Sequence, residues 1–335
     1  MQNSSIKIGL LGAGKFGFFH ANNLIQTGFD FIGAHDPLED RAKELAAKFN
    51  IKAYQDVDQL LDDCDAVLII TTTVHHFSML KKAISRNKHI FVEKPIVADY
   101  GEMQELSVLV RNYPKIIQIG HIERFNLMLQ KAFADPVFPW LINSTRLSPF
   151  NPRVSDVSVI HDLMIHDIDT VLTLAASTVV DVQATGYSYI SGLTDVCHTK
   201  ITFENGLQAN LFAGRIYKDA KREMDIYYQD RFEHMDFQSR MTTINFFEQQ
   251  PESSVEKDTV MIGNWPEVSL ARSMWQKVEQ YPENNAILSE LQAFYDAVAN
   301  DQPVRVGVRE AAETMRIISL IEEAMSKSNQ HHVYM

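Results

Sequence analysis

Residues 6–17, with the sequence IKIGLLGAGKFG, decide the fold of this chain. An apolar run ends at Leu11, the glycine-rich string Gly12-Ala13-Gly14-Lys15-Phe16-Gly17 follows at once, and a helical pattern comes next. Asp36 closes the next apolar run, about 20 residues further along the chain. A G-x-G-x-x-G string in this order of strand, turn, helix and acid predicts a dinucleotide-binding turn.

Each glycine of the string has a mechanical task in such a turn. Gly12 permits the tight bend, Gly14 leaves space for a pyrophosphate, and Gly17 lets the helix pack closely on the strand. The phosphates then meet unpaired N–H groups at the positive end of the helix, and the Asp36 carboxylate is expected to bind both ribose hydroxyls, which favours NAD over NADP. The alternative is a glycine-rich turn without a cofactor. The predicted cofactor residues here are Gly12, Gly14, Lys15, Phe16, Gly17 and Asp36.

Bulk properties restrict the class of protein. A chain of 335 residues with 45% hydrophobic content exceeds one typical domain, so two domains are expected. The formal net charge of −12 argues against nucleic acid or an anionic membrane as the main partner. Cys64 and Cys197 are too few for a disulfide framework and belong to no zinc-like cluster. The sequence has no apolar signal core and no membrane-length apolar run, so the expected location is the cytoplasm.

The first third of the chain alternates short apolar runs with amphipathic stretches, which is typical of βαβ repetition. Continuously apolar runs such as 66–70 are typical of parallel strands that helices cover on both faces. The pattern predicts an α/β fold whose residues 1–122 form a doubly wound parallel sheet of the Rossmann type. The expected strands lie near 6–11, 29–35, 66–70, 89–92 and 116–119, and the expected helices near 15–27, 39–48, 74–86 and 99–111.

Residues 123–335 are expected to form a second, α+β domain with a large, mostly antiparallel open sheet. A helix is predicted over 157–176, a long loop over 248–276, and two final helices near 284–299 and 308–327. We expect helices to cover one face of the sheet and a second subunit the other, in a homodimer or homotetramer. The expected strands lie near 180–190, 196–203, 207–214, 223–229 and 233–247.

Polar residues follow two of the predicted parallel strands, at the edge where open α/β sheets bind their ligands. Thr71 and Thr72 offer hydroxyls to the dinucleotide, or alternatively form a polar turn that caps the next helix. Lys94 places an ammonium at the rim of the nicotinamide pocket, although a lone lysine is usually a solvated surface group. Because Pro95 bars the helical conformation at Lys94 and permits a cis bond, we predict a cis Lys94–Pro95 peptide.

A second polar constellation lies in the helix predicted over 157–176. Asp162, His166 and Asp169 occupy positions i, i+4 and i+7 and so share one face, which we expect to border a cavity. Oxidation of an alcohol needs a base, and His166 is the natural one. Asp162 then orients His166 or binds substrate hydroxyls, while Lys94 stabilises the alkoxide. A purely structural role and a metal site are the alternatives, and no metal is predicted.

Four stretches together resemble the Gfo/Idh/MocA oxidoreductases, namely GLLGAGKFG at 9–17, TTTVHH at 71–76, EKP at 93–95 and DLMIHDID at 162–169. The resemblance spans most of the chain. It implies an N-terminal Rossmann domain followed by an open-sheet domain used for substrate binding and oligomerisation.

The resemblance also implies roles for single residues. Lys94, Asp162 and His166 match the catalytic lysine, aspartate and histidine of the family, and the matching stretches imply cofactor contacts for His76, Glu93 and Lys94. The chain departs from the family at Thr71-Thr72, where members often carry Thr-Pro. It departs again at Ser158-Val159-Ile160, where members often carry three glycines, and this second departure concerns the substrate.

Residues 120–126 and 162–169 look most similar to a branch that oxidises UDP-N-acetylglucosamine-type sugars at the 3-hydroxyl. Basic residues near the predicted cleft, Arg146 among them, suit a diphosphate because guanidinium groups bind phosphates with two hydrogen bonds. Scattered surface charge is the alternative. The expected substrate residues are Arg124, Asn126, Arg153, Asp162 and His166.

Three functions stay open on the sequence alone. The leading one is an NAD(P)-dependent dehydrogenase acting on a ring hydroxyl of a sugar, cyclitol or sugar nucleotide. The second is a glycosidase or lyase that oxidises its sugar transiently on a tightly held NAD. The third is a non-catalytic nucleotide sensor, against which Lys94 and His166 weigh because a sensor needs no proton acceptor.

Overall fold

The computed structural model describes residues 5–152, 157–248, 258–265, 267 and 273–329. The chain divides into two compact units, Met1–Phe125 with Asn285–Arg316, and Asn126–Asn284 with Ile317–Met335. The expected boundary at residue 122 assigned all later residues to a second domain, whereas the segment Asn285–Arg316 packs within the first unit. The assignment of cofactor and substrate tasks to the two units stays a prediction.

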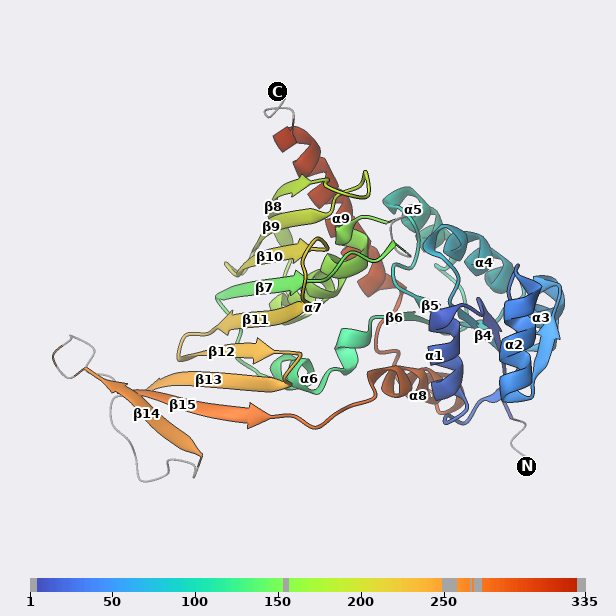
Figure 1. Cartoon of the computed structure of the whole chain (residues 1–335), viewed down its shortest axis with the longest axis horizontal. Coiled ribbons are helices and arrows are strands. Elements are labelled where there is room, and N and C mark those ends of the chain that lie inside the picture. Colours follow the sequence, from blue (N-terminus) through green and yellow to red (C-terminus); the bar gives the residue numbers. More distant parts are fainter. Residues whose placement is uncertain (1–4, 153–156, 249–257, 266, 268–272, 330–335) are drawn as a thin grey trace. The chain divides into compact units, whose positions relative to one another are not determined.

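The first unit contains a six-stranded sheet in the order β3-β2-β1-β4-β5-β6, with every neighbouring pair parallel. Figure 1 labels β4, β5 and β6 of this sheet. This order confirms the doubly wound Rossmann sheet. The strands are β1 (Lys7–Leu11), β2 (Asp30–His35), β3 (Lys52–Tyr54), β4 (Ala66–Ile69), β5 (His89–Glu93) and β6 (Ile117–Gly120). The helices between them are α1 (Lys15–Leu24), α2 (Glu39–Phe49), α3 (Val57–Asp63), α4 (Thr73–Ser85) and α5 (Tyr100–Leu109). The sequence pattern missed β3 and α3, which have only 3 and 7 residues.

Aromatic packing explains why the later segment returns to the first unit. The ring of Phe29, which precedes β2, lies 5.4 Å from the ring of Phe294 and meets Tyr295 edge-on at 5.0 Å, both on α8 (Ala286–Ala299). Helix α8 also packs on α1 and on the 3-10 turn η1 (Ile122–Phe125). Because Phe294 is fully buried, α8 completes the hydrophobic core on this side of the sheet.

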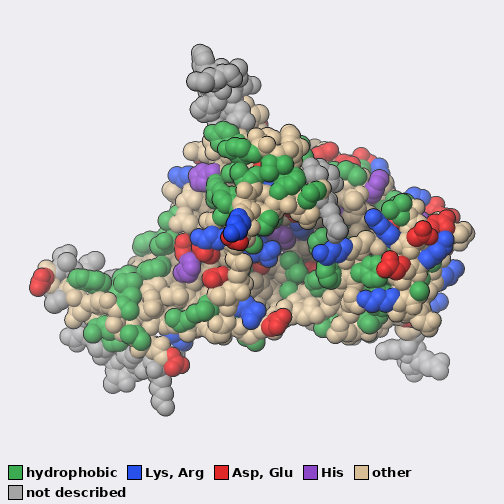
Figure 2. Space-filling view, viewed as in Figure 1, with side chains coloured by type: hydrophobic (Ala, Val, Ile, Leu, Met, Phe, Trp, Pro, Cys, Tyr) green, Lys and Arg blue, Asp and Glu red, His purple; other side chains and the backbone are tan. Residues whose placement is uncertain are grey.

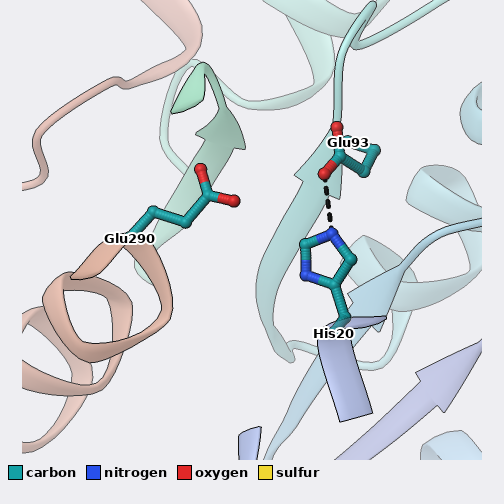
Figure 3. Close-up of side chains that lie close together, drawn as sticks. All are labelled: His20, Glu93 and Glu290. Carbon is teal, nitrogen blue, oxygen red and sulfur yellow. Dashed lines mark hydrogen bonds and ion pairs between the residues drawn. The ribbon is translucent and has the colours of Figure 1, made fainter. Parts of the chain in front are cut away.

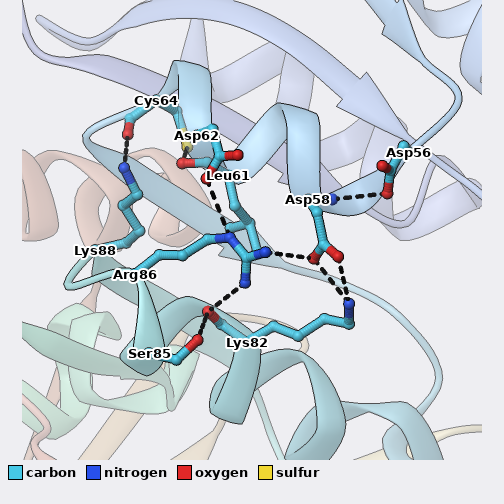
Figure 4. A network of polar contacts seen from close by, with 9 residues as sticks. All are labelled: Asp56, Asp58, Leu61, Asp62, Cys64, Lys82, Ser85, Arg86 and Lys88. Carbon is cyan, nitrogen blue, oxygen red and sulfur yellow. Dashed lines mark hydrogen bonds and ion pairs between the residues drawn. The ribbon is translucent and has the colours of Figure 1, made fainter.

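A charged network joins α3 to α4 on the surface (Figure 4). Asp58 accepts from Lys82 at 2.8 Å and from Arg86 at 3.1 Å, and Asp56 caps the start of α3. Arg86 also reaches Asp62 at 3.1 Å. Exposed ion pairs of this kind contribute little stability each, so the network fixes the two helices side by side more than it stabilises the fold.

The second unit is built on a nine-stranded sheet in the order β14-β15-β13-β12-β11-β7-β10-β9-β8. Every neighbouring pair is antiparallel except β7 with β10, so the prediction of a mostly antiparallel sheet is confirmed. The strands are β7 (Leu141–Leu147), β8 (Val179–Tyr187), β9 (Val196–Phe203), β10 (Gln208–Gly214), β11 (Lys221–Tyr227), β12 (Arg231–Asp236), β13 (Met241–Glu248), β14 (Thr259–Asn264) and β15 (Ser273–Gln280).

Two strand predictions in this sheet were wrong. The strand expected over 233–247 is the hairpin β12–β13, because Asp236 accepts from the backbone N–H of Gln238 and Arg240 takes a left-handed conformation with φ of 57°. The loop expected over 248–276 contains β14 and the beginning of β15, and β15 pairs with both β14 and β13. Strand β7 and the helix α6 (Leu127–Phe133) were not expected at all.

Helices cover one face of this sheet. The alternating residues Leu207, Ala209, Leu211 and Ala213 are buried, as their period of two predicts. The π-helix η3 (Ile160–Met164) contacts β7 and β10, and α7 (Ile165–Ala175) continues it along β10. Met325 of α9 (Val308–Asn329) lies 3.8 Å from the thiol of Cys197 on β9. Within the described ranges, no helix has the length and apolar character that crossing a bilayer requires.

Candidate active site

The site residues predicted for the first unit gather at the carboxyl edge of its parallel sheet. The strand register aligns Leu11 with Ile69, and Glu93 with Gly120, so the segments that follow β1, β4, β5 and β6 leave the sheet at one edge. The glycine turn, the threonines after β4, Lys94 and the turn η1 all begin there. This is the edge where open α/β sheets bind ligands.

The three glycines fit their predicted tasks. Gly12 has φ of 99°, and a Cβ there would lie 2.5 Å from the carbonyl oxygen of Ile70. At Gly17 a Cβ would lie 2.0 Å from the carbonyl oxygen of Gly12, so only glycine allows this contact between helix and turn. A Cβ on Gly14 would meet no atom within 4 Å, which leaves space in front of the first turn of α1.

The glycines give a testable contrast between folding and cofactor binding. Gly14→Ala is expected to melt at the wild-type temperature, because the backbone φ of −75° suits alanine and the space is open. Its NAD affinity is expected to fall by about tenfold or more, because the methyl group occupies the approach of the pyrophosphate. Gly17→Ala is expected to lose both stability and NAD binding. Thermal melting and calorimetric NAD titration check this, and wild-type NAD affinity in Gly14→Ala would contradict it.

Polar groups around the turn also suit a dinucleotide. Gly14 is the N-cap of α1 and offers no side-chain bond to the N–H groups of the first turn, so these groups suit an anionic ligand. Oδ2 of Asp36 accepts from the backbone N–H of Ala13 at 2.8 Å, and Oδ1 accepts from Leu38 at 2.9 Å. Each oxygen keeps a second lone pair for a ribose hydroxyl. The residues of this turn therefore fit NAD.

The other cofactor residues predicted beside the turn differ in burial and in hydrogen bonding. Lys15 and Phe16 are exposed at the start of α1, with the Lys15 ammonium 5.7 Å from the centre of the Phe19 ring. The buried hydroxyl of Thr71 has no hydrogen-bond partner among the described residues, which is consistent with a hydroxyl that awaits a ligand. Thr72 is the N-cap of α4 but makes no side-chain capping bond, so the alternative capping role is not seen.

His76 links two loops at the sheet edge. Its Nδ1 lies 2.8 Å from the carbonyl oxygen of Pro95, and its Nε2 lies 3.0 Å from that of Thr71. Burial lowers the pKa of His76. Since both ring nitrogens face protein carbonyls and the residue is 1% exposed, the structure favours a role in holding these loops together, and the cofactor contact stays a prediction.

The predicted cis peptide between Lys94 and Pro95 is confirmed. The backbone N–H of Lys94 donates to Oε2 of Glu93 at 3.0 Å, and Oε1 of Glu93 lies 2.7 Å from Nε2 of His20 on α1 (Figure 3). Burial acts to raise the pKa of Glu93, but the hydrogen bond and charge of His20 and the charge of Lys94 outweigh it and lower this pKa. Sequence reasoning missed His20, although it is a polar residue on the buried side of a helix.

The predicted substrate residues are spread over both units. Arg124 lies in η1, after β6, and is partly buried. Asn126 caps α6 by accepting from the backbone N–H of Met128 at 3.0 Å. Arg153 lies outside the described residues. Arg146 is 3% exposed and donates to Asp167 at 2.9 Å, so the idea that it binds a diphosphate was wrong.

The second unit carries Asp162 and His166 on a helix that begins irregularly. Residues Ile160–Met164 form a π-helix and only Ile165–Ala175 is α-helical, so the spacing of a regular helix expected for Asp162 and His166 does not hold. Both side chains are partly exposed, whereas Asp169 is 1% exposed. Wide turns of this kind are frequent at functional sites, which suits the predicted chemistry.

Two buried arginine–aspartate pairs hold this helix on either side of its predicted catalytic residues. Nε of Arg215 donates to Asp195 at 2.9 Å, and its Nη1 donates to the carbonyl oxygen of Val157, just before η3, at 2.7 Å. On the other side, Arg146 holds Asp167, the residue after His166. Burial acts to raise the pKa of Asp195, but hydrogen bonds from its own loop and from Arg215 hold this pKa below its ordinary range.

The pair of Arg215 with Asp195 predicts a large loss of stability on mutation. Arg215→Met is expected to lower the free energy of unfolding by about 3 kcal/mol at pH 7, because it leaves Asp195 buried without its partner. The exposed Arg222 gives a control, since Arg222→Met is expected to change stability by less than about 0.5 kcal/mol.

The same pair predicts a pH dependence. The pKa of Asp195 is lower in the folded protein than in the unfolded chain, where it is about 4. The contribution of Asp195 to the free energy of unfolding is therefore present above the unfolded pKa and is lost as pH falls through the folded pKa. The stability gap between wild type and Arg215→Met is therefore expected to narrow in acid. Urea unfolding at several pH values measures it, and equal stability of Arg215→Met and Arg222→Met at pH 7 would contradict this account.

Comparison with known families matches both parts of the chain. Residues 6–121 match a model described as an oxidoreductase family with an NAD-binding Rossmann fold. Residues 119–233 match a model of the Gfo/Idh/MocA C-terminal domain.

Individual relatives match nearly the whole chain. UDP-N-acetylglucosamine 3-dehydrogenase from Acidithiobacillus ferrooxidans is 31% identical over 303 residues, which cover 89% of this chain and 90% of the relative. A solved structure of that enzyme has a TM-score of 0.84 at 29% identity, covering 96% and 97% of the two chains. Myo-inositol 2-dehydrogenase from Thermotoga maritima is 24% identical over 96% of each chain. Scyllo-inositol dehydrogenase from Lactobacillus casei, solved with NAD(H) and scyllo-inositol, shares the fold with a TM-score of 0.75 at 22% identity over 97% and 98% of the chains.

Proposed function

This chain belongs to the Gfo/Idh/MocA family of NAD-binding oxidoreductases, and we propose that it oxidises the 3-hydroxyl of UDP-N-acetylglucosamine or of a sugar nucleotide built like it. It is an NAD-dependent enzyme acting on a secondary hydroxyl of a sugar. The observation that carries the choice of substrate is the 31% identity to a UDP-N-acetylglucosamine 3-dehydrogenase along 89% of the chain. The inositol dehydrogenases among the relatives act on the same kind of ring hydroxyl.

We propose that the glycine turn holds the cofactor. The N–H groups at the start of α1 bind the pyrophosphate, the space at Gly14 admits it, and Asp36 binds the ribose hydroxyls. When bound there, NAD supplies the acceptor for the hydride. Asp36 supports NAD over NADP, because a 2′-phosphate would meet its carboxylate.

The proton chemistry is assigned to three residues. His166 accepts the proton of the substrate hydroxyl, since a neutral imidazole is a base near neutral pH. Lys94 stabilises the oxygen as negative charge develops on it, and Asp162 binds a neighbouring hydroxyl or orients His166. Support comes from Lys94 at a strand tip and from the anchoring of the helix that carries Asp162 and His166.

Binding of the UDP group is proposed for Arg124 and Asn126. Arg124 follows β6 at the ligand edge of the first sheet, and a guanidinium suits a diphosphate. Asn126 uses its oxygen as a helix cap, and the N–H groups of an amide side chain are donors of the type that bind phosphate oxygens. Arg153 stays a prediction from the sequence.

We further propose that the enzyme is a homodimer or homotetramer formed through the second unit's sheet. Hydrophobic side chains gather over β14 and β15 (Figure 2), where Val260, Met261 and Ile262 are 63%, 51% and 45% exposed. Neighbouring exposed apolar side chains of this kind are typical of a protein interface. A monomeric mass in sedimentation would exclude the assembly.

The two buried free cysteines support a reducing compartment, and we place the protein in the cytoplasm.

A substrate screen tests the proposed function. UDP-N-acetylglucosamine, other UDP-sugars, free sugars and inositols are each incubated with the enzyme and NAD⁺, and NADH is followed by absorbance. Net NADH with UDP-N-acetylglucosamine is expected. Cleavage of a sugar bond without net NADH would favour transient oxidation in a glycosidase or lyase, and binding without any turnover would favour a sensor.

A further inference from the structure

A buried acid lies beside the residues that precede Lys94. Glu290 on α8, His20 on α1 and Glu93 on β5 point toward one another (Figure 3). One side-chain nitrogen or oxygen of each residue lies within 4.8 Å of those of the other two. Glu290 and His20 are both 1% exposed. Gln118 donates to the backbone carbonyl of Glu290 at 2.8 Å, which holds this turn of α8 in place.

The carboxyl group of Glu290 forms no hydrogen bond within the described part of the chain. Neither of its oxygens has a hydrogen-bond partner among the described residues, and the same is true of Nδ1 of His20. Burial first, and the nearby charge of Glu93 second, raise the pKa of Glu290 well above its ordinary value. An ionised carboxylate in this position would be costly, so burial favours the protonated form of Glu290.

A protonated carboxyl group supplies what the neighbouring imidazole lacks. It carries one O–H donor and one carbonyl acceptor, so it can satisfy Nδ1 of His20 whether or not that nitrogen bears a proton. A ring nitrogen of His20 and a carboxyl oxygen of Glu290 lie within 4.8 Å of each other, a separation that a side-chain rotation or one bridging water spans. On its other side, Nε2 of His20 already binds Glu93, and Glu93 accepts from the backbone N–H of Lys94.

We propose that Glu290, His20 and Glu93 form a hydrogen-bonded chain that fixes the backbone at Lys94. Glu290 and His20 are thus positioning residues that act on catalysis through Lys94, and this part of the inference rests on the proposed function. A divalent metal in the same place fits less well. Two ligands of one metal at about 2.1 Å lie more than about 3 Å apart, whereas His20 and Glu93 are 2.7 Å apart.

Hydrogen exchange tests the chain without any substrate. Glu290→Leu keeps the volume and removes the polar group, Glu290→Gln keeps a neutral donor and acceptor, and Gln292→Ala on the same helix is the control. The peptide covering 89–98 is expected to exchange on the order of tenfold faster at the Lys94 amide in Glu290→Leu, and at the wild-type rate in the other two variants. His20→Phe is expected to behave as Glu290→Leu. Unchanged exchange in both Glu290→Leu and His20→Phe would overturn the chain.

Kinetics and metal analysis complete the test. Glu290→Leu is expected to lower kcat on the order of 10- to 100-fold with the KM for NAD within roughly threefold of wild type, and Glu290→Gln to restore kcat to within roughly threefold. An equal loss of kcat in Glu290→Gln and Glu290→Leu would overturn the positioning role. One tightly bound metal ion per wild-type chain that is absent from both variants would also overturn the positioning role. A wild-type enzyme inactive on every UDP-sugar would overturn the proposed function alone, because the exchange result needs no substrate.

Discussion

Lys94→Ala is expected to lower kcat on the order of a thousandfold while the Kd for NAD changes by less than about fivefold. The ammonium is proposed to stabilise negative charge that develops on the substrate oxygen only as the bond to the proton breaks. An interaction made only in the transition state affects kcat and leaves ground-state binding almost unchanged. Steady-state kinetics with UDP-N-acetylglucosamine and calorimetric NAD titration separate the two quantities.

Lys88 provides a control for the removal of a lysine near the same strand. Its ammonium donates to the backbone carbonyl of Cys64 at 2.7 Å, near the opposite end of β5 from Lys94. Lys88→Ala is expected to keep wild-type kcat. If Lys94→Ala also keeps it, Lys94 has no part in the chemistry.

His166→Asn is the second large effect, with an expected loss of kcat/KM between about 10²- and 10⁴-fold. The asparagine preserves most of the volume and removes the proton acceptor. In the wild type, kcat/KM is expected to fall in acid as the base becomes protonated, and this acidic limb is expected to disappear in His166→Asn. The pH profile therefore distinguishes loss of a base from simple disturbance of the helix.

His198 on β9 is exposed, and His198→Asn serves as the matched control with an unchanged profile. An acidic limb that survives in His166→Asn would show that another group is the base. The double variant Lys94→Ala/His166→Asn adds a further test. If both residues act on one proton transfer, the double variant is expected to lose about as much kcat/KM as the worse single variant. If their roles are independent, the fold-losses of the two single variants multiply.

The first unit was largely predictable because its signals are local. The continuously apolar run that became β4, and the glycine turn between β1 and α1, each set their structure within a few residues. The missing pieces, β3 and α3, are too short for a periodic pattern to stand out. The helix α8 was expected, but nothing local indicates that Phe294 and Tyr295 return to pack on Phe29.

The second unit was harder to predict because its pairings are distant. Strand β7 pairs with β10 and β11, and both of these strands begin more than sixty residues after β7 ends. The sequence of β7, LINSTRL, has weak strand character on its own. The hairpin at Asp236 depends on hydrogen bonds that its carboxylate accepts from Gln238 and Ser239 in the turn. The wide turn of η3 is set by packing and by the hold of Arg215 on Val157, which no helical periodicity reveals.

The candidate site shows the same division. Lys94 was found from its position at a strand tip and the glycine turn from its motif, whereas the residues that contact them were not found. Glu290 carried a usable signal, since it interrupts the apolar face of α8 next to Leu291 and Phe294. A buried acid on such a face needs a partner or a proton. No sequence pattern indicated that Arg146 forms a buried ion pair. An arginine in a strand has the same sequence pattern whether it pairs with an aspartate or binds a phosphate.

Transfer of a label tests the central claim most directly. UDP-N-acetylglucosamine carrying deuterium at C3 is incubated with the enzyme and NAD⁺, and the cofactor and sugar products are analysed by mass spectrometry. We predict that one deuterium per turnover appears in the reduced cofactor, in step with formation of a 3-keto sugar nucleotide. Reduced cofactor without the label, or a label that stays in a sugar whose other bonds are cleaved, would contradict the account.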